Sequence, residues 1–302
     1  MHFRLLGTAA GGGFPQWNCA CATCTSSRIE PETVSSRLQL QAAVWNSTDA
    51  IFLLNASPDL RLQIEANPEL RPRTDRAKRN TPIQGIVLTT ADLDQILGLL
   101  LLREFQPLTL YTTTLVRRVL EANSFFRMLD RVPNQMSWVE IEAGVPFVLG
   151  KSEIVCTPFA IPADLPFYAR ELGSSAPGQA GLGLLLESHG MRIAYTPVVP
   201  EITDALRAIY SRCEAIFVDG TFWSDDELNR IHAGMPSARD IGHVPMSGKN
   251  GTMDKLSDMP ALQKVYVHLN NTNPVLDPRS GAYNAVVEAG WKIAQDGWEL
   301  KQ

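Results

Sequence analysis

The chain has 302 residues, of which 45% are hydrophobic and 20% are charged. This composition excludes a mainly disordered or fibrous protein, because it provides enough apolar side chains for a large core. With 27 basic and 32 acidic residues the net charge is -5, which excludes a general attraction for nucleic acid.

Short apolar runs bounded by turn residues predict β-strands along most of the chain. These strands are expected at Phe3 to Gly7, Leu38 to Trp45, Ala50 to Asn55, Gly85 to Thr89, Leu108 to Thr112, Ser137 to Ile141, Val155 to Ala160, Gly181 to Glu187, Arg192 to Thr196, Ala215 to Val218 and Lys264 to Leu269. Helical spacing of apolar residues predicts helices between many of the strands. These helices are expected at Asp59 to Asn67, Leu93 to Phe105, Thr114 to Phe126, Glu201 to Ser211, Asp225 to Arg230, Met253 to Met259 and Asn284 to Ala294.

The order of these elements indicates the fold class. Early strands are joined by short links, whereas later strands alternate with helices. This order predicts an α/β protein with two mixed sheets flanked by helices rather than one doubly wound sheet. No internal repeat or low-complexity linker divides the sequence. We therefore expect residues 1–302 to form a single domain.

The sequence also bears on location. The longest apolar stretch, Ile96 to Leu102, has 7 residues, whereas a membrane span needs about 20. The N-terminus carries one basic residue, Arg4, and leads at once into the loop Gly7 to Gly13, without the apolar core of a secretory signal. We expect a cytoplasmic protein with no membrane partner.

Three of the five cysteines, Cys19, Cys21 and Cys24, fall within six positions of one loop. Zinc gathers thiolates in a tetrahedron, so this C-x-C-x-x-C loop can supply three ligands of a structural zinc site and needs a fourth from elsewhere. Three free thiols or a redox pair are the alternatives. Cys156 and Cys213 lie in apolar strand contexts and are expected to be small buried side chains.

Polar side chains follow the expected strand Gly85 to Thr89, namely Thr90, Asp92, Asp94 and Gln95. Polar groups after a buried strand are typical of the sites of α/β proteins, and the two carboxylates could hold a hard cation. Alternatively, Asp92 caps the helix that follows, and Asp94 and Gln95 solvate its first turn. The residues alone leave both interpretations open.

Two later strands also end in polar residues. Asp219 and Gly220 follow one apolar strand, and His268 ends another, ahead of an amide cluster that includes Asn271. Each signal alone is weak, because a strand-end Asp-Gly is usually a turn and a lone His is more often a hydrogen-bonded polar group than a ligand.

Over nearly its whole length the chain resembles the PqqB family of pyrroloquinoline quinone (PQQ) biosynthesis proteins, which belongs to the metallo-β-lactamase superfamily. The motifs that carry the resemblance are Leu6 to Cys19, Asn55 to Arg61, Gly98 to Glu104, Phe125 to Leu129, Val218 to Trp223, Gly242-His243 and His268 to Pro274. The resemblance implies a four-layer αββα sandwich of two mixed sheets flanked by helices.

The resemblance also assigns site positions. In the superfamily's T-H-x-H-x-D-H metal motif, Thr90 and Asp92 stand at the first two histidines, Asp94 stands at the aspartate and Gln95 at the last histidine. A di-zinc hydrolase site is not expected, since its imidazoles are absent. A hard cation could still use the carboxylates.

Two further positions match the superfamily's site. Asp219 stands at its bridging aspartate and His268 at its final histidine. The resemblance therefore implies one active cleft, with Gln95 at its edge, which gathers Asp92, Asp94, Asp219 and His268.

The family implies a role in making PQQ from a Glu-Tyr pair of a small precursor peptide. The favoured activity is an iron-dependent, oxygen-using hydroxylation of the tyrosine ring, because non-haem Fe(II) needs only about three His and carboxylate ligands. A carrier of PQQ or its precursor and a degenerate hydrolase are the alternatives. The implied partners are the peptide-derived substrate or PQQ and other proteins of the pathway, with no nucleic acid, and a homodimer is one option for the assembly.

The family also implies cofactors. The three loop cysteines match its zinc loop, which implies a structural Zn²⁺ in addition to Fe²⁺ in the cleft. For the fourth zinc ligand, position favours Asn271 and zinc chemistry favours His268. The chain departs from the family at Gln95, where His is common, and an amide oxygen binds iron more weakly than an imidazole does. This departure favours the carrier.

Overall fold

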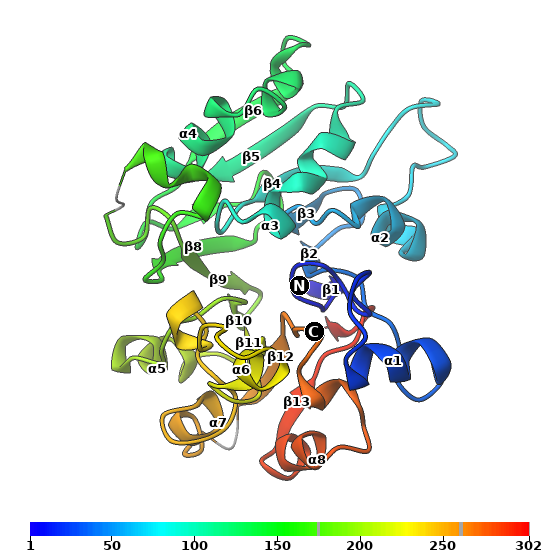
Figure 1. Ribbon diagram of the computed structural model, residues 1–302. Helices are drawn as coiled ribbons and strands as arrows, with labels where there is room; N and C mark the ends of the chain where they lie inside the picture. Colours follow the sequence, from blue (N-terminus) through cyan, green and yellow to red (C-terminus); the bar gives the residue numbers. More distant parts are fainter. Residues whose placement is uncertain (174–175, 260–261, 302) are drawn as a thin grey trace. The chain divides into compact units, whose positions relative to one another are not determined.

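The computed structural model describes residues 1–173, 176–259 and 262–301, and the chain divides into two compact units. The first unit comprises Met1–Gly7, Gln41–Met191 and Gly297–Gln302, and the second comprises Thr8–Leu40 and Arg192–Asp296. Each unit joins segments that are far apart in the sequence, as the colours of Figure 1 show. The single domain expected from the sequence stays a prediction.

Two seven-stranded sheets contain the strands of the described residues. The first sheet lies in the first unit and has the order β14 (Glu299–Lys301), β1 (His2–Gly7), β2 (Gln41–Trp45), β3 (Ile51–Leu54), β4 (Ile83–Val87), β5 (Leu108–Thr112) and β6 (Met136–Glu140). Its strands pair antiparallel from β14 to β3 and parallel from β3 to β6, so this sheet is mixed.

The second sheet has the order β13 (Trp291–Ile293), β12 (Gln263–Val267), β11 (Ala215–Asp219), β10 (Met191–Thr196), β9 (Leu182–Ser188), β8 (Val155–Ala160) and β7 (Phe147–Val148). Its strands pair antiparallel from β7 to β9 and parallel from β10 to β13. The predicted α/β class with two mixed sheets is confirmed.

In the first unit, one hydrophobic core packs helices against the first sheet. These helices are α2 (Leu60–Ala66), α3 (Leu93–Ile96) and α4 (Thr114–Ala122), with the 3-10 helices η1 (Pro68–Leu70), η2 (Leu97–Leu102), η3 (Phe126–Asp130) and η4 (Phe167–Leu172). Fully buried Ile86 and Leu110 of the strands share this core with Leu99 and Val116 of the helices. In Figure 1, α3 and α4 accordingly lie beside β4 and β5.

The predicted helix Leu93 to Phe105 is wrong in its second part, which continues as the 3-10 helix Leu97–Leu102. Gly98 explains the change. Its backbone N–H donates a hydrogen bond to the Ala56 carbonyl oxygen at 2.8 Å, and a Cβ there would collide with the Ser57 carbonyl oxygen. The backbone of this turn therefore packs directly on the loop after β3, which regular α-helical geometry would prevent.

In the second unit, α1 (Ala22–Ile29) lies between β1 and β2 in the chain. The parallel strands are connected by α5 (Asp204–Tyr210), α6 (Glu227–Ile231), α7 (Thr252–Lys255) and α8 (Gly281–Glu288), with the 3-10 helices η5 (Arg239–Ile241) and η6 (Pro274–Leu276). The predicted helix Asn284 to Ala294 is wrong beyond Glu288. Gly290, in the left-handed region at φ 77°, follows the end of α8, and the chain then enters β13.

The parallel strands of the second unit place their carboxyl ends at one sheet edge. There, β11 ends at Asp219 and β12 ends one residue before His268. The glycine-rich loop is fastened to the same edge, because the Leu269 N–H donates to the Thr8 carbonyl oxygen at 2.9 Å and the Ala10 N–H donates to the Leu269 carbonyl oxygen at 2.8 Å. Such an edge is where parallel α/β sheets bind ligands.

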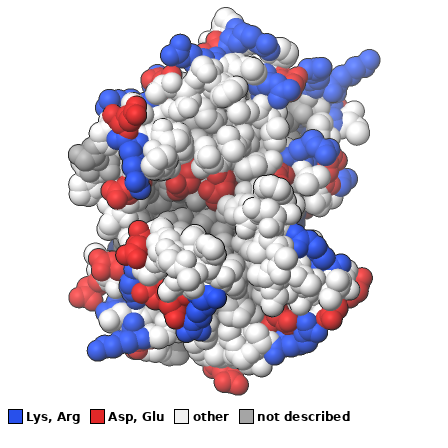
Figure 2. Space-filling model, viewed as in Figure 1, with Lys and Arg blue, Asp and Glu red and all other residues white. Residues whose placement is uncertain are grey.

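The longest helix of the described residues, α4, has nine residues. No helix there combines the length and hydropathy needed to cross a bilayer. On the face drawn in Figure 2, Lys and Arg side chains are interspersed with Asp and Glu in both units.

Candidate metal centre

Asp219, His243 and His268 form a compact cluster in the second unit. Asp219 lies opposite Val267 in the parallel ladder, which brings His268 next to it. The loop after η5 adds His243, whose Nδ1 lies 2.8 Å from Asp219 Oδ2. Each of the three side chains offers one ligand atom, and these atoms lie within 4.8 Å of one another. The structure thus brings two of the predicted site residues together and adds a second imidazole.

The Asp219 carboxylate is fully buried and carries a dense set of hydrogen bonds. It accepts from the Val199 N–H at 2.9 Å, from the Thr221 N–H at 3.0 Å and from the Thr221 hydroxyl at 2.6 Å. Burial alone would raise the pKa of Asp219, but attraction to His243 and His268 and the hydrogen bonds lower that pKa below its ordinary value. The site therefore holds a buried anion beside two imidazole rings.

The sequence did not identify His243 as a site residue. Two backbone hydrogen bonds hold this residue in place. The His243 N–H donates to the Ala238 carbonyl oxygen at 2.9 Å, and the Val244 N–H donates to the Val199 carbonyl oxygen at 2.7 Å. Its ring stacks on that of His268, with centroids 5.6 Å apart and planes at 20°. The one signal in the sequence was the Gly242-His243 pair among the family motifs.

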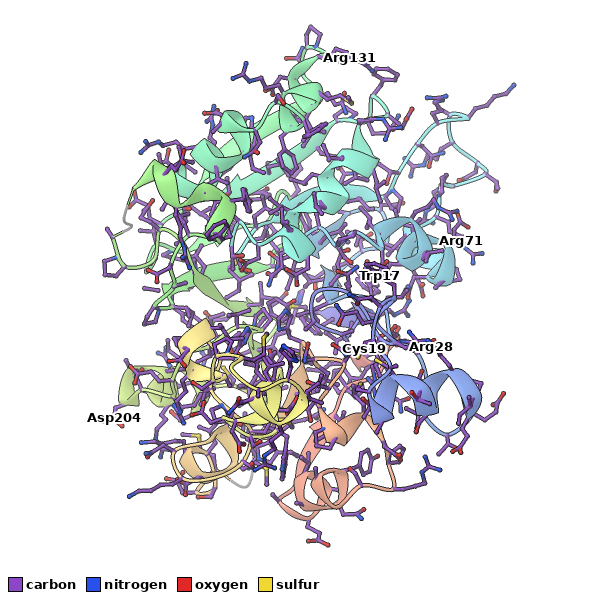
Figure 3. The ribbon with its side chains drawn as sticks, in the orientation of Figure 1. Trp17, Cys19, Arg28, Arg71, Arg131 and Asp204 are labelled. Carbon is purple, nitrogen blue, oxygen red and sulfur yellow. The ribbon has the colours of Figure 1, made fainter. Side chains whose placement is uncertain are left out.

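The three loop cysteines form a second cluster, in which one sulfur from each lies within 4.8 Å of the others. Cys21 stands at the N-cap of α1, and Cys24 is fully buried in its first turn. Burial raises the pKa of Cys24 to about 11, whereas hydrogen bonds with Thr23 and the backbone outweigh burial and lower the pKa of Cys21. Figure 3 shows Cys19 near Arg28, whose guanidinium donates to the Cys19 carbonyl oxygen at 2.6 Å.

Asn271 lies against these thiols. Its side-chain Nδ2 is 3.5 Å from Cys24 Sγ and 3.8 Å from Cys21 Sγ. Its backbone carbonyl oxygen accepts from the Thr23 hydroxyl at 2.5 Å. A half-turn of the side-chain amide would bring Oδ1 to the same place. Of the two residues considered for the fourth ligand, Asn271 is the one beside the cysteines, whereas His268 lies with Asp219.

Asp92 and Asp94 belong to the first unit. Asp92 occupies the N-cap position of α3, but its side chain caps no N–H of that helix. It accepts a hydrogen bond from the Thr90 hydroxyl at 2.6 Å, and its own N–H donates to that hydroxyl at 2.8 Å. Asp94 is half-buried in the first turn. The interpretation of Asp92 as a side-chain helix cap is therefore wrong.

Gln95 is fully buried rather than solvating the helix start. Its Oε1 accepts from Asn55 Nδ2 at 2.5 Å and from the Thr89 hydroxyl at 3.0 Å. Asn55 Oδ1 in turn accepts from the Thr89 N–H at 2.8 Å. The amide thus joins the ends of β3 and β4 inside the core of the first unit.

Replacing Asn55 with alanine should lower the free energy of unfolding by about 2–4 kcal/mol, because buried groups of Thr89 and Gln95 lose their partners. Asn55 also has a left-handed backbone, at φ 67°. Asn250 is the matched control, because it is exposed and left-handed at φ 61°. Asn250→Ala should cost only about 1 kcal/mol. Equal losses in urea unfolding would contradict this account of the cluster.

A second buried carboxylate supports the segment after His268. Glu227 of α6 accepts hydrogen bonds from the Thr272 hydroxyl and from the Trp223 N–H, both at 2.6 Å. Burial outweighs these bonds and raises the pKa of Glu227 to about 7. As the pH rises, the folded protein therefore keeps the proton on Glu227 up to a higher pH than the unfolded chain does.

Glu227→Gln should remove a pH dependence of stability. An unfolded Glu titrates near pH 4.3, so the folded protein binds the extra proton between about pH 4 and 7, and its free energy of unfolding falls as the pH rises through that window. We expect a contribution of about 3 kcal/mol between pH 5 and 8 that is absent in the variant. Glu288→Gln, an exposed control, should keep it. The same pH slope in Glu227→Gln would contradict the expectation.

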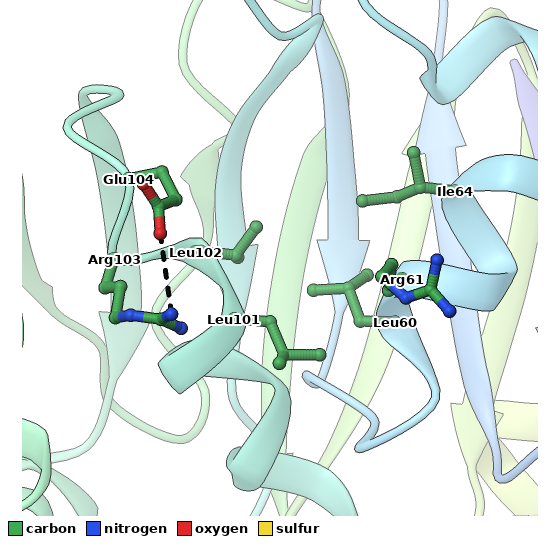
Figure 4. A pocket seen from close by; sticks show the side chains of 7 residues that line it. All are labelled: Leu60, Arg61, Ile64, Leu101, Leu102, Arg103 and Glu104. Carbon is green, nitrogen blue, oxygen red and sulfur yellow. Dashed lines mark ion pairs between the residues drawn. The ribbon is translucent and has the colours of Figure 1, made fainter.

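The first unit has a separate hollow of about 290 Å³ between α2 and η2, drawn in Figure 4. It is lined by Leu60, Arg61, Ile64, Leu101, Leu102, Arg103 and Glu104. Its charged groups include Arg103 and Glu104, which form an ion pair at 3.5 Å. Neither the cysteine cluster nor the Asp219 cluster contributes to this lining. Both of these clusters, which are the candidate ligand sets of the described residues, lie in the second unit.

Comparisons with known proteins agree over almost the whole chain. A model of the β-lactamase superfamily domain matches residues 51–269. Coenzyme PQQ synthesis protein B of Methylobacterium radiotolerans is 38% identical over 302 residues, which are 99% of each chain. The protein of the same name from Gluconacetobacter diazotrophicus is 39% identical and covers 98% of each chain.

Solved structures give the same answer for the fold. The crystal structure of Zn(2+)-bound PqqB from Methylobacterium extorquens matches with a TM-score of 0.93 and 35% identity over 100% of both chains. A diphosphatase of the PhnP family matches with a TM-score of 0.70 at 18% identity, over 100% of this chain and 97% of that one, a likeness of fold alone. The fold is the metallo-β-lactamase fold that the sequence implied.

Proposed function

The chain belongs to the coenzyme PQQ synthesis protein B family of the β-lactamase superfamily and has a role in PQQ biosynthesis, and we propose that this role is a metal-dependent oxygenation. The proposed substrate is the crosslinked Glu-Tyr intermediate of the precursor peptide, and the proposed reaction is hydroxylation of its tyrosine ring. One observation carries the proposal: Asp219, His243 and His268 meet at one sheet edge.

This set suits non-haem iron by its donor types. Such a centre uses two imidazoles and a carboxylate, with open positions for oxygen and substrate. His243 and His268 would hold the metal. Asp219 would supply the negative charge, either as a ligand or through hydrogen bonds to the rings. That Asp92 and Asp94 complete the ligand set stays a prediction.

Bound Fe(II) would supply the chemistry with O₂ that side chains alone lack. In the overall reaction one oxygen atom enters a ring C–H bond and the other leaves as water, so each hydroxylation consumes two electrons and two protons from a reductant such as ascorbate. The chain's own groups would hold this site together. Asp219 stays ionised at neutral pH, since its pKa is lowered, and so balances the metal charge.

We also propose that the loop cysteines hold a structural zinc, with Asn271 as the fourth ligand. The spacing of the thiols and the position of Asn271 support this assignment, as does the zinc in the PqqB relative. Such a zinc would fasten α1 to the segment after β12. That segment already pairs with the glycine-rich loop through Leu269.

The test is a turnover assay with heavy-oxygen O₂. Protein purified without oxygen is loaded with Fe(II) and given the crosslinked peptide, ascorbate and labelled O₂. The proposal expects product that carries label from O₂ at the tyrosine ring. Unchanged peptide, or label that comes only from water, would contradict an oxygenase.

A carrier of PQQ or its precursor is the second candidate, and Gln95 favours it. The amide oxygen of Gln95 is engaged by Asn55 and Thr89 in the core, where the family commonly has an imidazole. A carrier would bind PQQ without Fe(II) and would leave the peptide unchanged in the labelled-oxygen assay. Equilibrium dialysis of the metal-free protein with PQQ distinguishes it from the oxygenase.

A further inference from the structure

The hydroxyl of Thr221 contacts each of the three residues of the candidate iron site. Its Oγ1 lies 2.6 Å from Asp219 Oδ1, 2.8 Å from His268 Nδ1 and 3.0 Å from His243 Nδ1. Thr221 is only 3% exposed, and it follows β11 by two residues. A hydroxyl has one proton to donate, so these contacts constrain where the protons of the cluster lie.

The direction of each hydrogen bond follows from the partners of Asp219. Its two oxygens accept from the backbone N–H groups of Val199 and Thr221, so the carboxylate acts as an acceptor and the Thr221 hydroxyl donates its proton to Asp219 Oδ1. Thr221 Oγ1 is then an acceptor toward His268, which must carry its proton on Nδ1. His243 Nδ1 faces Asp219 Oδ2 directly, at 2.8 Å, and must also carry a proton there.

We propose that Thr221 is a positioning residue that relays the charge of Asp219 to His268, so that one buried carboxylate fixes both imidazoles as Nδ1–H tautomers. A neutral imidazole with its proton on Nδ1 presents the lone pair of Nε2. Asp219 therefore acts on His243 directly and on His268 through Thr221. In this arrangement Nε2 is the nitrogen that each ring offers to a metal.

In this assignment, the role of Asp219 in the proposed site is to orient both histidines. The assignment rests on the proposed function only for the identity of the metal. The four hydrogen bonds that Asp219 accepts from Val199, Thr221 and His243 use both of its oxygens. A carboxylate that orients metal-binding histidines through Nδ1–H is a recurrent arrangement in metal sites. Here a single carboxylate orients two histidines.

The first test reads the tautomers without metal. Long-range ¹H–¹⁵N spectra of the five histidines, assigned by single substitutions, should show the proton of His243 and His268 on Nδ1. In Thr221→Val, which keeps the shape and the backbone turn, His268 should lose this preference while His243 keeps it. Thr221→Ser should restore His268. An unchanged His268 in Thr221→Val would overturn the relay.

The second test measures Fe(II) affinity without oxygen. Thr221→Val should weaken binding about 10–100-fold, as the loss of an outer-shell partner does, and Thr221→Ser should bind like the parent chain. Thr252→Val is the matched control, because it removes another fully buried hydroxyl of the same unit, one that bonds Tyr266. Equal Fe(II) affinity in Thr221→Val and the parent would overturn the role.

The two tests separate the relay from the proposed function. If the tautomers follow Thr221 as expected but the parent chain binds no Fe(II), the relay stands and the iron site fails. If Fe(II) binds tightly but His268 carries its proton on Nε2, the iron site stands and the relay fails.

Discussion

Fe(II) binding is expected to weaken by about 100-fold or more when His243 is replaced by alanine, because the proposed site then loses one of its two imidazoles. Oxygen consumption with the crosslinked peptide should fall with it. The effect should be local, since His243 lies in a loop and its backbone hydrogen bonds do not depend on the ring. Anaerobic titration with Fe(II) measures the loss.

His232→Ala is the matched control for this experiment. His232 lies in the same unit, at the end of α6, and is exposed. The variant should bind Fe(II) like the parent chain. If His243→Ala and His232→Ala bind Fe(II) equally well, the cluster around Asp219 is not the iron site.

Cys21→Ser is expected to remove the structural zinc and to lower the melting temperature in the same step. Two thiolates and an amide hold zinc poorly, and the binding free energy of a structural zinc is folding free energy. Each kcal/mol lost corresponds to about 2–4 °C for a domain of this size, so a loss of several kcal/mol should lower the melting temperature by roughly 10 °C. Zinc content and calorimetry are measured on the same sample.

Cys213→Ser controls for the loss of a thiol in the second unit. Cys213 is half-buried, and its thiol donates to the Ile209 carbonyl oxygen at 3.4 Å, away from the loop cysteines. This variant should keep its zinc and nearly all of its stability. Full zinc content in Cys21→Ser would contradict the assignment of the loop.

The sequence could predict the meeting of Asp219 and His268, because each ends a strand of parallel type and such ends share one sheet edge. It could not place His243 there. That residue follows a 3-10 turn without any strand pattern, and the contact between Val244 and Val199 that positions it joins residues 45 positions apart. Contacts of this kind leave no periodic signal in a sequence.

Gln95 illustrates the same limit. Its place in the motif suggested a cleft position, but its partner Asn55 is 40 positions away, and the core hydrogen bond between them is invisible in the sequence. The helix α1 was missed for a local reason, since most of its eight residues are small or polar and form no apolar stripe. The strands β7, β13 and β14 have only two or three residues, too few for an alternating pattern.

The metal content of protein purified without oxygen tests the central claim most directly. After addition of excess Fe(II) and removal of unbound metal, elemental analysis should find one zinc and one iron per chain. His243→Ala should retain the zinc and lose the iron, and Cys21→Ser should lose the zinc. A parent chain that holds zinc alone after Fe(II) loading would contradict the oxygenase and leave the carrier as the function of this protein.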